Sequence, residues 1–324
     1  MEQLNTSKRK VWQHSGEVNR QGSYYAKVKK DFRRNKGLYL IVFPVVLYFF
    51  IFHYIPMYGA LIAFKDFSPT RGFNGSDFVG IKHFITFFQS FYIWRLIRNT
   101  VLISIYGLLF GFPAPIILAL SLNELRSQRF KRSIQTITYI PHFISMVVIA
   151  GIIVDFTKQG GIITNMLEGL LGYDGNLLLR KEYFRTIFVS SGIWQQVGWG
   201  SIIYLAALSG INPELYEAAK IDGAGRWRQT LNITIPGILP TIMILLILNV
   251  GSLMNVGFEK VMLLYNTRTY ETADVISTFV YRKGILEAQF SYAAAVGLFN
   301  STIACTLVIL SNWISKKTTD LSLW

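Results

Sequence analysis

Six long apolar segments constrain the fold of this chain more than any other feature of its sequence. They cover residues 38–63, 98–122, 134–156, 186–210, 238–262 and 290–314. A helix needs about 20 mostly apolar residues to cross the hydrocarbon core of a bilayer, and each segment meets that length. Inside lipid a helix satisfies its own backbone N–H and C=O groups, whereas an irregular segment does not. The sequence therefore predicts an all-α membrane protein with six transmembrane helices.

Charged residues are scarce and lie mainly between these segments. Of the 324 residues, 52% are hydrophobic and 15% are charged, whereas a soluble domain usually has about 25% charged residues. The first segment, from Leu38 to Ala63, contains no Lys, Arg, Asp or Glu. The length alone would allow two soluble domains, but this clustering favours a multi-pass membrane protein.

Basic residues gather on one side of a six-helix arrangement. They occur in residues 1–37, after the second predicted helix, between the fourth and fifth, and in the tail at Lys316 and Lys317. Because cytoplasmic loops carry the excess of Lys and Arg, both termini are expected in the cytoplasm. The net charge of +14 then describes a basic rim facing anionic lipid headgroups. No zinc-finger spacing or RNA-binding signature indicates nucleic acid.

This orientation divides the chain into three parts. Residues 1–37 form a basic cytoplasmic segment, 38–314 the transmembrane domain, and 315–324 a cytoplasmic tail. Tyr24–Lys36 mixes aromatic and basic residues, as in an amphipathic helix on the inner membrane surface; the alternative is a flexible basic tail. Residues 1–22 are polar and are expected to be poorly ordered.

A polar interruption separates the fourth apolar segment from the fifth. It reads Tyr-Glu-Ala-Ala-Lys-Ile-Asp-Gly-Ala at 216–224, followed by Ile-Pro-Gly-Ile-Leu-Pro at 235–240. Glu217 and Lys220 are spaced about one helical turn apart, and Gly223 allows a turn that a residue with a Cβ would resist. The two prolines are expected to end the polar segment and begin the next apolar one. The alternative is an ordinary amphipathic loop helix whose Glu217 faces water.

This pattern resembles the cytoplasmic coupling loop of the permease subunits of bacterial ATP-driven (ABC) importers. Five further runs are similar to the polysaccharide-type branch of the carbohydrate permeases: Tyr-Ile-Pro-Met-Tyr-Gly at 54–59, Ala-Phe-Lys-Asp-Phe at 63–67, Val-Gly-Ile-Lys-His-Phe at 79–84, Thr-Tyr-Ile-Pro at 138–141 and Gly-Phe-Glu-Lys-Val at 257–261. Within that branch the chain is similar to the first permease subunit of alginate-oligosaccharide importers. One position departs from the family pattern, which often has an aromatic residue where this chain has Thr230. This departure concerns how tightly the second part of the loop packs.

The resemblance implies a type I ABC importer permease fold in the bacterial cytoplasmic (inner) membrane, working by alternating access. Its coupling loop, residues 212–240, would dock on an ATPase through Glu217, Ala218, Ala219, Asp222, Gly223, Ala224, Pro236 and Pro240. The implied partners are a second, related permease subunit in a heterodimer, two ATPase subunits, an extracytoplasmic solute-binding protein, membrane lipid and an oligosaccharide cargo, with alginate-derived oligosaccharides as one candidate.

Polar residues inside the predicted helices mark candidate positions for substrate contact. Such residues are costly in lipid and face a cavity or another helix; amides suit sugar hydroxyls, and aromatic rings suit sugar faces. The candidates are Trp194, Gln195, Gln196 and Trp199 in the fourth helix, Asn249, Ser252 and Asn255 at intervals of three on the fifth, and Asn300 in the sixth. The alternative is hydrogen bonding between helices.

An anionic cargo would need positive charge, and the predicted helices contain no obvious central Lys or Arg. The counter-charge is expected from the outer loops, from the partner permease, or from Gln, Asn and backbone N–H groups. The outer-loop cations are Lys158, Arg180, Lys181, Arg268, Arg282 and Lys283.

The sequence shows no signature of catalysis or metal binding. It has no phosphate-binding Gly-Lys-Ser/Thr loop, its four histidines lack metal-ligand spacing, and Cys305 is its single cysteine. We therefore expect a non-catalytic subunit that binds no cofactor itself, with ATP and Mg²⁺ bound by the partner ATPase. A stand-alone secondary transporter or channel is the alternative; it predicts inverted repeats and a membrane-embedded ion site. An intramembrane enzyme would need a catalytic dyad or metal cluster at membrane depth. None of these features is evident in the sequence.

Overall fold

The computed structural model describes residues 24–172, 175–319 and 322. The expectation for residues 1–22 therefore falls outside the described residues. The chain divides into two compact units, residues 1–61 and residues 62–324. Each unit is described by itself.

The first unit consists of helices in sequence. They are α1 (Tyr24–Arg34), α2 (Lys36–Phe49), the π-helical turn η1 (Phe50–Tyr54), α3 (Ile55–Met57) and the start of η2 (Tyr58–Phe64). The side chain of Asp31 accepts hydrogen bonds from Asn35 Nδ2 and from the Tyr39 hydroxyl, both at 2.8 Å, and so ties α1 to α2. Residues Lys36–Phe64 are long and apolar enough to cross a membrane, which agrees with the predicted segment 38–63.

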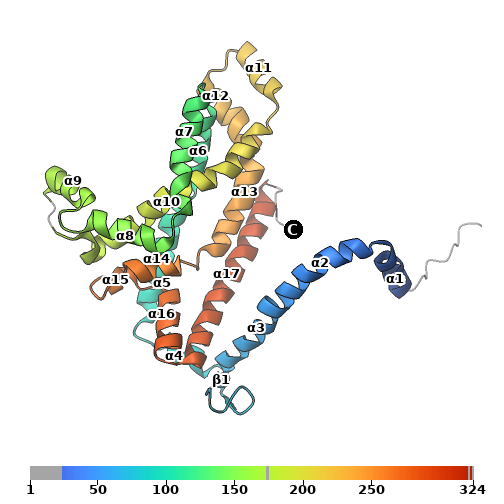
Figure 1. The fold of residues 1–324 in the computed structure, drawn as a ribbon, viewed down its shortest axis with the longest axis vertical. Coiled ribbons are helices and arrows are strands. Elements are labelled where there is room, and N and C mark those ends of the chain that lie inside the picture. Colours follow the sequence, from blue (N-terminus) through green and yellow to red (C-terminus); the bar gives the residue numbers. More distant parts are fainter. Residues whose placement is uncertain (1–23, 173–174, 320–321, 323–324) are drawn as a thin grey trace, which may run out of the picture. The chain divides into compact units, whose positions relative to one another are not determined.

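Long helices form the body of the second unit. They are α5 (Ile93–Tyr106), η3 (Gly107–Gly111), α6 (Pro113–Asn123), α10 (Lys181–Ser209), α13 (Ile235–Ser252) and α17 (Phe290–Thr319). Helix α10 packs on α6 and on α13, and α13 runs beside α17 (Figure 1). Tyr204 and Leu208 of α10 meet Ala119 of α6 and Ile238 of α13 in one buried apolar cluster. These contacts place the two helices that flank the predicted loop against each other.

Shorter elements connect the long helices of the second unit. They are β1 (Lys65–Asp66), β2 (Asp77–Phe78), α4 (Lys82–Phe88), α7 (Gln128–Tyr139), η4 (Ile140–Phe143), α8 (Met146–Thr157), α9 (Ile162–Leu171), η5 (Leu177–Leu179), α11 (Pro213–Ile221), α12 (Arg226–Gln229), η6 (Thr230–Thr234), α14 (Phe258–Leu264), α15 (Tyr270–Ala273), α16 (Ile276–Tyr281) and η7 (Arg282–Leu286). The antiparallel pair β1–β2 is two residues long and is a small departure from the predicted all-α fold.

Five helical stretches among the described residues are long and apolar enough to span a membrane. They are Lys36–Phe64, Ile93–Asn123, Met146–Leu170, Arg226–Ser252 and Phe290–Thr319. The predicted fourth segment, 186–210, lies within α10, a continuous helix of 29 residues. Its length corresponds to about 43 Å, but it is not among those five stretches. Its polar residues, such as Gln195 and Gln196, explain its lower apolar character.

Two predicted helices have different boundaries in the structure. The segment 134–156 is interrupted: α7 ends at Tyr139, η4 follows around Pro141, and extended Ser145 caps α8 by accepting from the Val148 N–H at 3.5 Å. Proline lacks an N–H for the helical ladder, and serine favours a new helix start. The segment 238–262 is also too long as one helix, because α13 ends at Ser252.

Candidate functional site

Helix α11 lies in the loop between α10 and α13, and its two ends are capped by local hydrogen bonds. At its start, the Asn212 side chain accepts from the Glu214 N–H at 3.0 Å. At its end, the Ala224 N–H donates to the Ala219 carbonyl at 2.8 Å and the Gly223 N–H to the Lys220 carbonyl at 3.1 Å. This pair of bonds is a Schellman cap, which requires a left-handed residue. Gly223 has a φ of +75°, so the predicted turn at this glycine is confirmed.

Three contacts attach the loop to the long helices. The Tyr216 hydroxyl of α11 lies 3.0 Å from Thr234 Oγ1, just before α13. Gln229 Nε2 donates to the Ala224 carbonyl at 2.7 Å, which joins α12 to the turn after α11. A Cβ built on Gly237 would lie 2.8 Å from Ile211 Cδ1, so this glycine allows α13 and the start of the loop to pack closely. The loop is therefore built to follow any movement of α13.

The two prolines were expected to end the polar segment and begin the next apolar one, and the structure agrees for Pro236 but not for Pro240. Pro236 lies in the first turn of α13 and Pro240 inside the same helix. The helical path is continuous from Arg226 to Ser252 and includes the π-helical turn η6 at Thr230–Thr234. A π-helical turn changes the local hydrogen-bond register, and here it ends at Thr234, shortly before Pro236, which has no N–H to donate to the helical ladder. At Thr230, where the family pattern often has an aromatic residue, Oγ1 bonds the Arg226 carbonyl at 3.0 Å.

The outer surface of the loop combines exposed apolar and charged side chains. Ile221 is 87% exposed and Trp227 is 77% exposed, and Glu217 and Asp222 are exposed beside them. Ala218 is exposed and Ala219 half-buried, which leaves room for close approach from outside. Large exposed apolar side chains among charges are typical of a surface that another protein covers.

Helix α10 carries a second group of predicted residues, and a histidine from η4 joins it. His142 Nδ1 lies 3.0 Å from Gln196 Oε1, and the His142 ring stacks on Trp199 with centroids 4.4 Å apart and an interplanar angle of 2°. A Cβ on Gly198 would lie 2.1 Å from the Thr138 carbonyl oxygen. Gly198 thus lets the end of α7 touch α10, and this contact holds His142 over the helix.

The four predicted residues of this helix do not share one environment. Gln196 and Trp199 are three residues apart and lie on neighbouring parts of one face. Gln195 is buried, with 4% of its surface exposed. Trp194 lines a different, largely apolar cavity of about 390 Å³ together with Phe156 and Tyr183. The structure therefore groups Gln196 and Trp199 with His142 and separates the other two.

The remaining predicted residues lie elsewhere. Asn249 and Ser252 are exposed on α13 and bond to carbonyl groups of their own helix. The expectation that Asn255 continues this face is wrong, because α13 ends at Ser252. Asn300 Nδ2 donates to the Met254 carbonyl at 3.4 Å, and Asn300 lines a cavity of about 600 Å³. Within the described residues no hydrogen bond joins any of these four to Gln196 or His142.

A buried charge cluster at the other end of the second unit was not anticipated from the sequence. The Asp274 side chain is 0% exposed and pairs with Arg95 at 3.1 Å and with Arg282 at 2.8 Å. Asn99, also fully buried, donates to the carbonyl groups of Glu271 and Asp274 at 3.0 Å each. These bonds join α5 to α15 and to Asp274 just after it, and Asp274 in turn to η7. The charges were visible in the sequence, but their pairing over long sequence separations was not.

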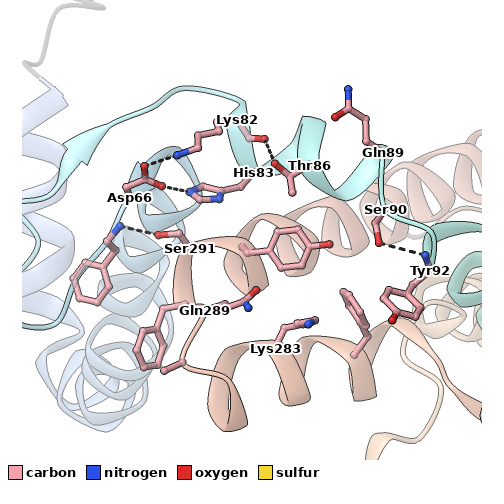
Figure 2. Close-up of a pocket in the computed structure, with 15 residues that line it drawn as sticks. Asp66, Lys82, His83, Thr86, Gln89, Ser90, Tyr92, Lys283, Gln289 and Ser291 are labelled. Carbon is pink, nitrogen blue, oxygen red and sulfur yellow. Dashed lines mark hydrogen bonds and ion pairs between the residues drawn. The ribbon is translucent and has the colours of Figure 1, made fainter.

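A pocket of about 740 Å³ lies near the start of α17 (Figure 2). On one side Asp66 accepts from Lys82 at 2.7 Å and pairs with His83 at 2.9 Å. The hydrogen bond and charge of Lys82 lower the pKa of Asp66 from its ordinary value. Lys283 also lines the pocket and pairs with Glu287 at 2.5 Å. Both lysines are therefore neutralised by carboxylates of the chain itself.

The described residues contain no group of three or more His, Cys, Asp or Glu that could hold a metal ion.

Helix α11 lies at one end of the second unit, and helices α4 and α16 lie at the other end (Figure 1). The loop and the charge cluster thus lie at opposite ends of the long helices.

Comparison with known proteins gives concordant matches. Residues 111–319 match the family model described as the binding-protein-dependent transport system inner membrane component. Protein LplB of Bacillus subtilis (strain 168) is 46% identical over 88% of this chain and 90% of its own length. The polygalacturonan/rhamnogalacturonan transport system permease protein YteP of the same strain is 44% identical over 88% of this chain and 89% of its own length.

A solved structure is similar over nearly the whole chain. It is a bacterial alginate ABC transporter in complex with an alginate pentasaccharide-bound periplasmic protein. One of its chains superimposes with a TM-score of 0.84 and 44% sequence identity, covering 91% of this chain and 99% of that chain. At 44% identity, the two chains are similar in sequence as well as in fold.

Proposed function

This chain belongs to the family of binding-protein-dependent transport system inner membrane components, and we propose that it forms one half of the membrane pathway of an acidic-oligosaccharide importer. It is a non-catalytic permease subunit; its relative YteP is named as a transport system permease protein. In the proposed assembly, a related second permease completes a heterodimer, two ATPase subunits bind ATP and Mg²⁺, and a solute-binding protein delivers cargo.

The anchored helix α11 is the observation that carries this proposal. An ATPase can drive a permease only if its movement reaches the membrane helices. Tyr216, Gln229 and Gly237 attach the loop to α13, while Ile221, Trp227 and Glu217 remain free for a partner surface. Such a helix would transmit a rigid-body movement of the docked ATPase to α13 and, by packing, to α10.

The acidic character of the cargo is proposed from the similar proteins. YteP is named for polygalacturonan and rhamnogalacturonan transport, and the matched solved structure concerns the acidic polysaccharide alginate. These polymers carry carboxylate groups on sugar rings. We propose an oligosaccharide of this chemical class as the cargo here, with alginate-derived and galacturonate-derived oligomers as the first to test.

The proposed topology has six membrane helices and both termini in the cytoplasm. Helix α10 would be the sixth span beside the five apolar stretches, since polar residues in a span are tolerated where they face a pathway or a neighbouring helix. The Lys and Arg residues of 1–37, of the loop 212–240 and of the tail 315–324 then share the cytoplasmic side, in keeping with the positive-inside rule.

Affinity purification of the chain from its native membrane tests this function. We expect a second permease and an ATPase to co-purify, and the ATPase activity to rise when a sugar-loaded binding protein is added. A chain that purifies alone or only with copies of itself, and that transports without ATP, would instead be a secondary transporter or channel.

A further inference from the structure

A basic cluster surrounds the beginning of α10, at the end remote from α11. One network of ion pairs and hydrogen bonds joins its members. Its cations are Arg95, Arg98, Lys181, Arg185 and Arg282, and its carboxylates are Asp274 and Glu271. Glu182 adds a further negative charge that acts on Lys181. Five positive charges thus face three negative ones, so the cluster is positive overall.

Two of these arginines are held by uncharged hydrogen-bond acceptors. Arg98 Nη2 donates to the backbone carbonyl of Glu271 at 3.3 Å, and Arg185 Nη2 donates to Asn99 Oδ1 at 2.8 Å. Both acceptors are uncharged, and neither guanidinium forms an ion pair with any residue in the described part of the chain. The two arginines are linked through Asn99. Its side chain accepts from Arg185 and donates to the same Glu271 carbonyl that accepts from Arg98.

The network also has hydrogen-bond donors without acceptors. Within the described residues, Nε of Arg95, Nε of Arg185 and Nη1 of Arg282 are buried and have no partner. A buried donor that lacks an acceptor is unfavourable and calls for an explanation. A guanidinium group presents paired N–H donors that fit the two oxygens of a carboxylate. The cluster therefore has unused capacity for a ligand of this chemistry.

Arg185 lies on the polar face of α10, and Arg98 of α5 lies near it, because Asn99 contacts both Arg185 and Glu271. Arg185 and Gln196 are eleven residues apart, which is about three full turns and about 16 Å along the helix, so they lie on the same face. Between them Lys260 of α14 reaches this helix: its Nζ donates to the Phe188 carbonyl at 2.7 Å and lies 3.3 Å from where a Cβ on Gly192 would be. Lys260 likewise forms no ion pair with a described residue. From the start of α10 toward the loop, the face thus carries Arg185, then the amide of Gln196 and Trp199, with Lys260 buried against it at 4% exposure.

We propose that this face of α10 binds the carboxylate groups of an acidic oligosaccharide, and that Arg98 and Arg185 receive the first of them as the cargo enters the membrane pathway. The inference rests on the proposed function, and it names the residues of this chain that bind the negative charge of the cargo. It also adds a source of counter-charge to those expected from the sequence (outer loops, the partner permease, and Gln, Asn and backbone N–H groups), because Arg185 lies on α10 and Lys260 packs against it. Cargo is favoured over an acidic patch of the binding protein because Arg185 is half-buried one turn inside the helix, not at the tip of a loop.

The test uses the complete transporter in proteoliposomes with its binding protein and ATP. Initial uptake is measured for an acidic oligosaccharide, an alginate or galacturonate tetramer, and for the same tetramer with its carboxyl groups reduced to alcohols. We expect Arg98→Gln and Arg185→Gln each to slow uptake of the acidic tetramer about tenfold, the effect of one lost charge-assisted hydrogen bond, and to leave uptake of the neutral tetramer unchanged. Arg98 is exposed and makes one hydrogen bond to the described residues, so Arg98→Gln keeps the test valid if Arg185→Gln fails to fold.

Arg71→Gln is the matched control, because Arg71 is an exposed arginine already paired with Asp77 at 3.1 Å; it should transport both tetramers like the parent. Equal loss for both tetramers, together with weaker binding of the empty binding protein, would assign the cluster to protein docking and overturn the proposal. Unchanged uptake of the acidic tetramer in both variants would also overturn it. If the parent transporter imports neither tetramer, it is the proposed function that fails.

Discussion

The hydroxyl of Tyr216 lies 3.0 Å from Thr234 Oγ1, and this contact links the middle of α11 to the last residue before α13. Thr234 is buried, with 3% of its surface exposed. The link ties a helix with an exposed outer surface to one of the long membrane helices. It is the most direct path along which a push on α11 would reach α13.

We expect Tyr216→Phe to uncouple ATP hydrolysis from transport without disturbing membrane insertion. The substitution removes one hydrogen bond, whose net worth is about 0.5–1.5 kcal/mol, and loosens the attachment of α11. The number of sugars imported per ATP should fall, while basal ATP hydrolysis remains. Thr302→Val serves as the control, since this exposed hydroxyl bonds only the Leu298 carbonyl of its own helix. An unchanged ratio in Tyr216→Phe would show that the link is not needed.

Gly223→Asp is expected to abolish transport while the protein still reaches the membrane. With φ at +75°, any residue with a Cβ is strained by roughly 1 kcal/mol or more, and the Schellman cap of α11 would open. Gly225→Ala is the control, because Gly225 has φ −68° and nothing lies within 4 Å of a built Cβ. Uptake and membrane content are measured together; normal uptake by a correctly inserted Gly223→Asp protein would contradict the role given to this turn.

Gly198→Ala should destabilise the protein and displace His142. Its Cβ would lie 2.1 Å from the Thr138 carbonyl oxygen, so α7 and α10 would have to separate. Overpacking of this kind typically costs about 1–3 kcal/mol. In the matched variant Gly151→Ala, on α8, the new Cβ meets nothing within 4 Å, and a helical Gly→Ala change there should be neutral or stabilising. Thermal unfolding in detergent compares the two; equal melting temperatures would contradict the close contact.

Asp274→Asn should be among the most destabilising single substitutions in the second unit. It leaves the Arg95 and Arg282 guanidinium groups facing a neutral side chain in a buried site, and breaking a buried ion pair costs about 3–5 kcal/mol. Asp77→Asn removes an exposed partner of Arg71 and should change stability by about 0.5 kcal/mol or less. The measurement is the melting temperature of each variant; similar values would mean that Asp274 is not paired as described.

The sequence predicted the helices best where the apolar pattern was long and unbroken. The segment 38–63 differs from the observed stretch Lys36–Phe64 by only a few residues, because nothing polar interrupts it. The break between α7 and α8 was missed since apolar residues continue on both sides of Pro141, and hydrophobicity does not report a change of direction. Pro240, conversely, was expected at the boundary between the polar loop and the fifth helix, whereas it lies inside α13.

The candidate site was only partly predictable, because side-chain partners that are distant in sequence decide it. The turn at Gly223 depends on its immediate neighbours and could be predicted from the local pattern. Gln196 was identified as a polar residue in an apolar run, but its partner His142 lies 54 positions away. The pairing of Arg95 with Asp274 spans 179 positions, and no local pattern indicates it.

Cross-linking from α11 to the ATPase tests the central claim most directly. Cys305 is the only cysteine of the chain, so Cys305→Ser followed by Glu217→Cys gives a single thiol on the exposed surface of α11. In the assembled transporter, a cysteine-to-lysine cross-linker should join this thiol to the ATPase subunit, whereas the same thiol introduced by Lys82→Cys, at the other end of the unit, should not. A cross-link to the ATPase from Lys82→Cys and none from Glu217→Cys would contradict the assignment of α11 as the coupling helix.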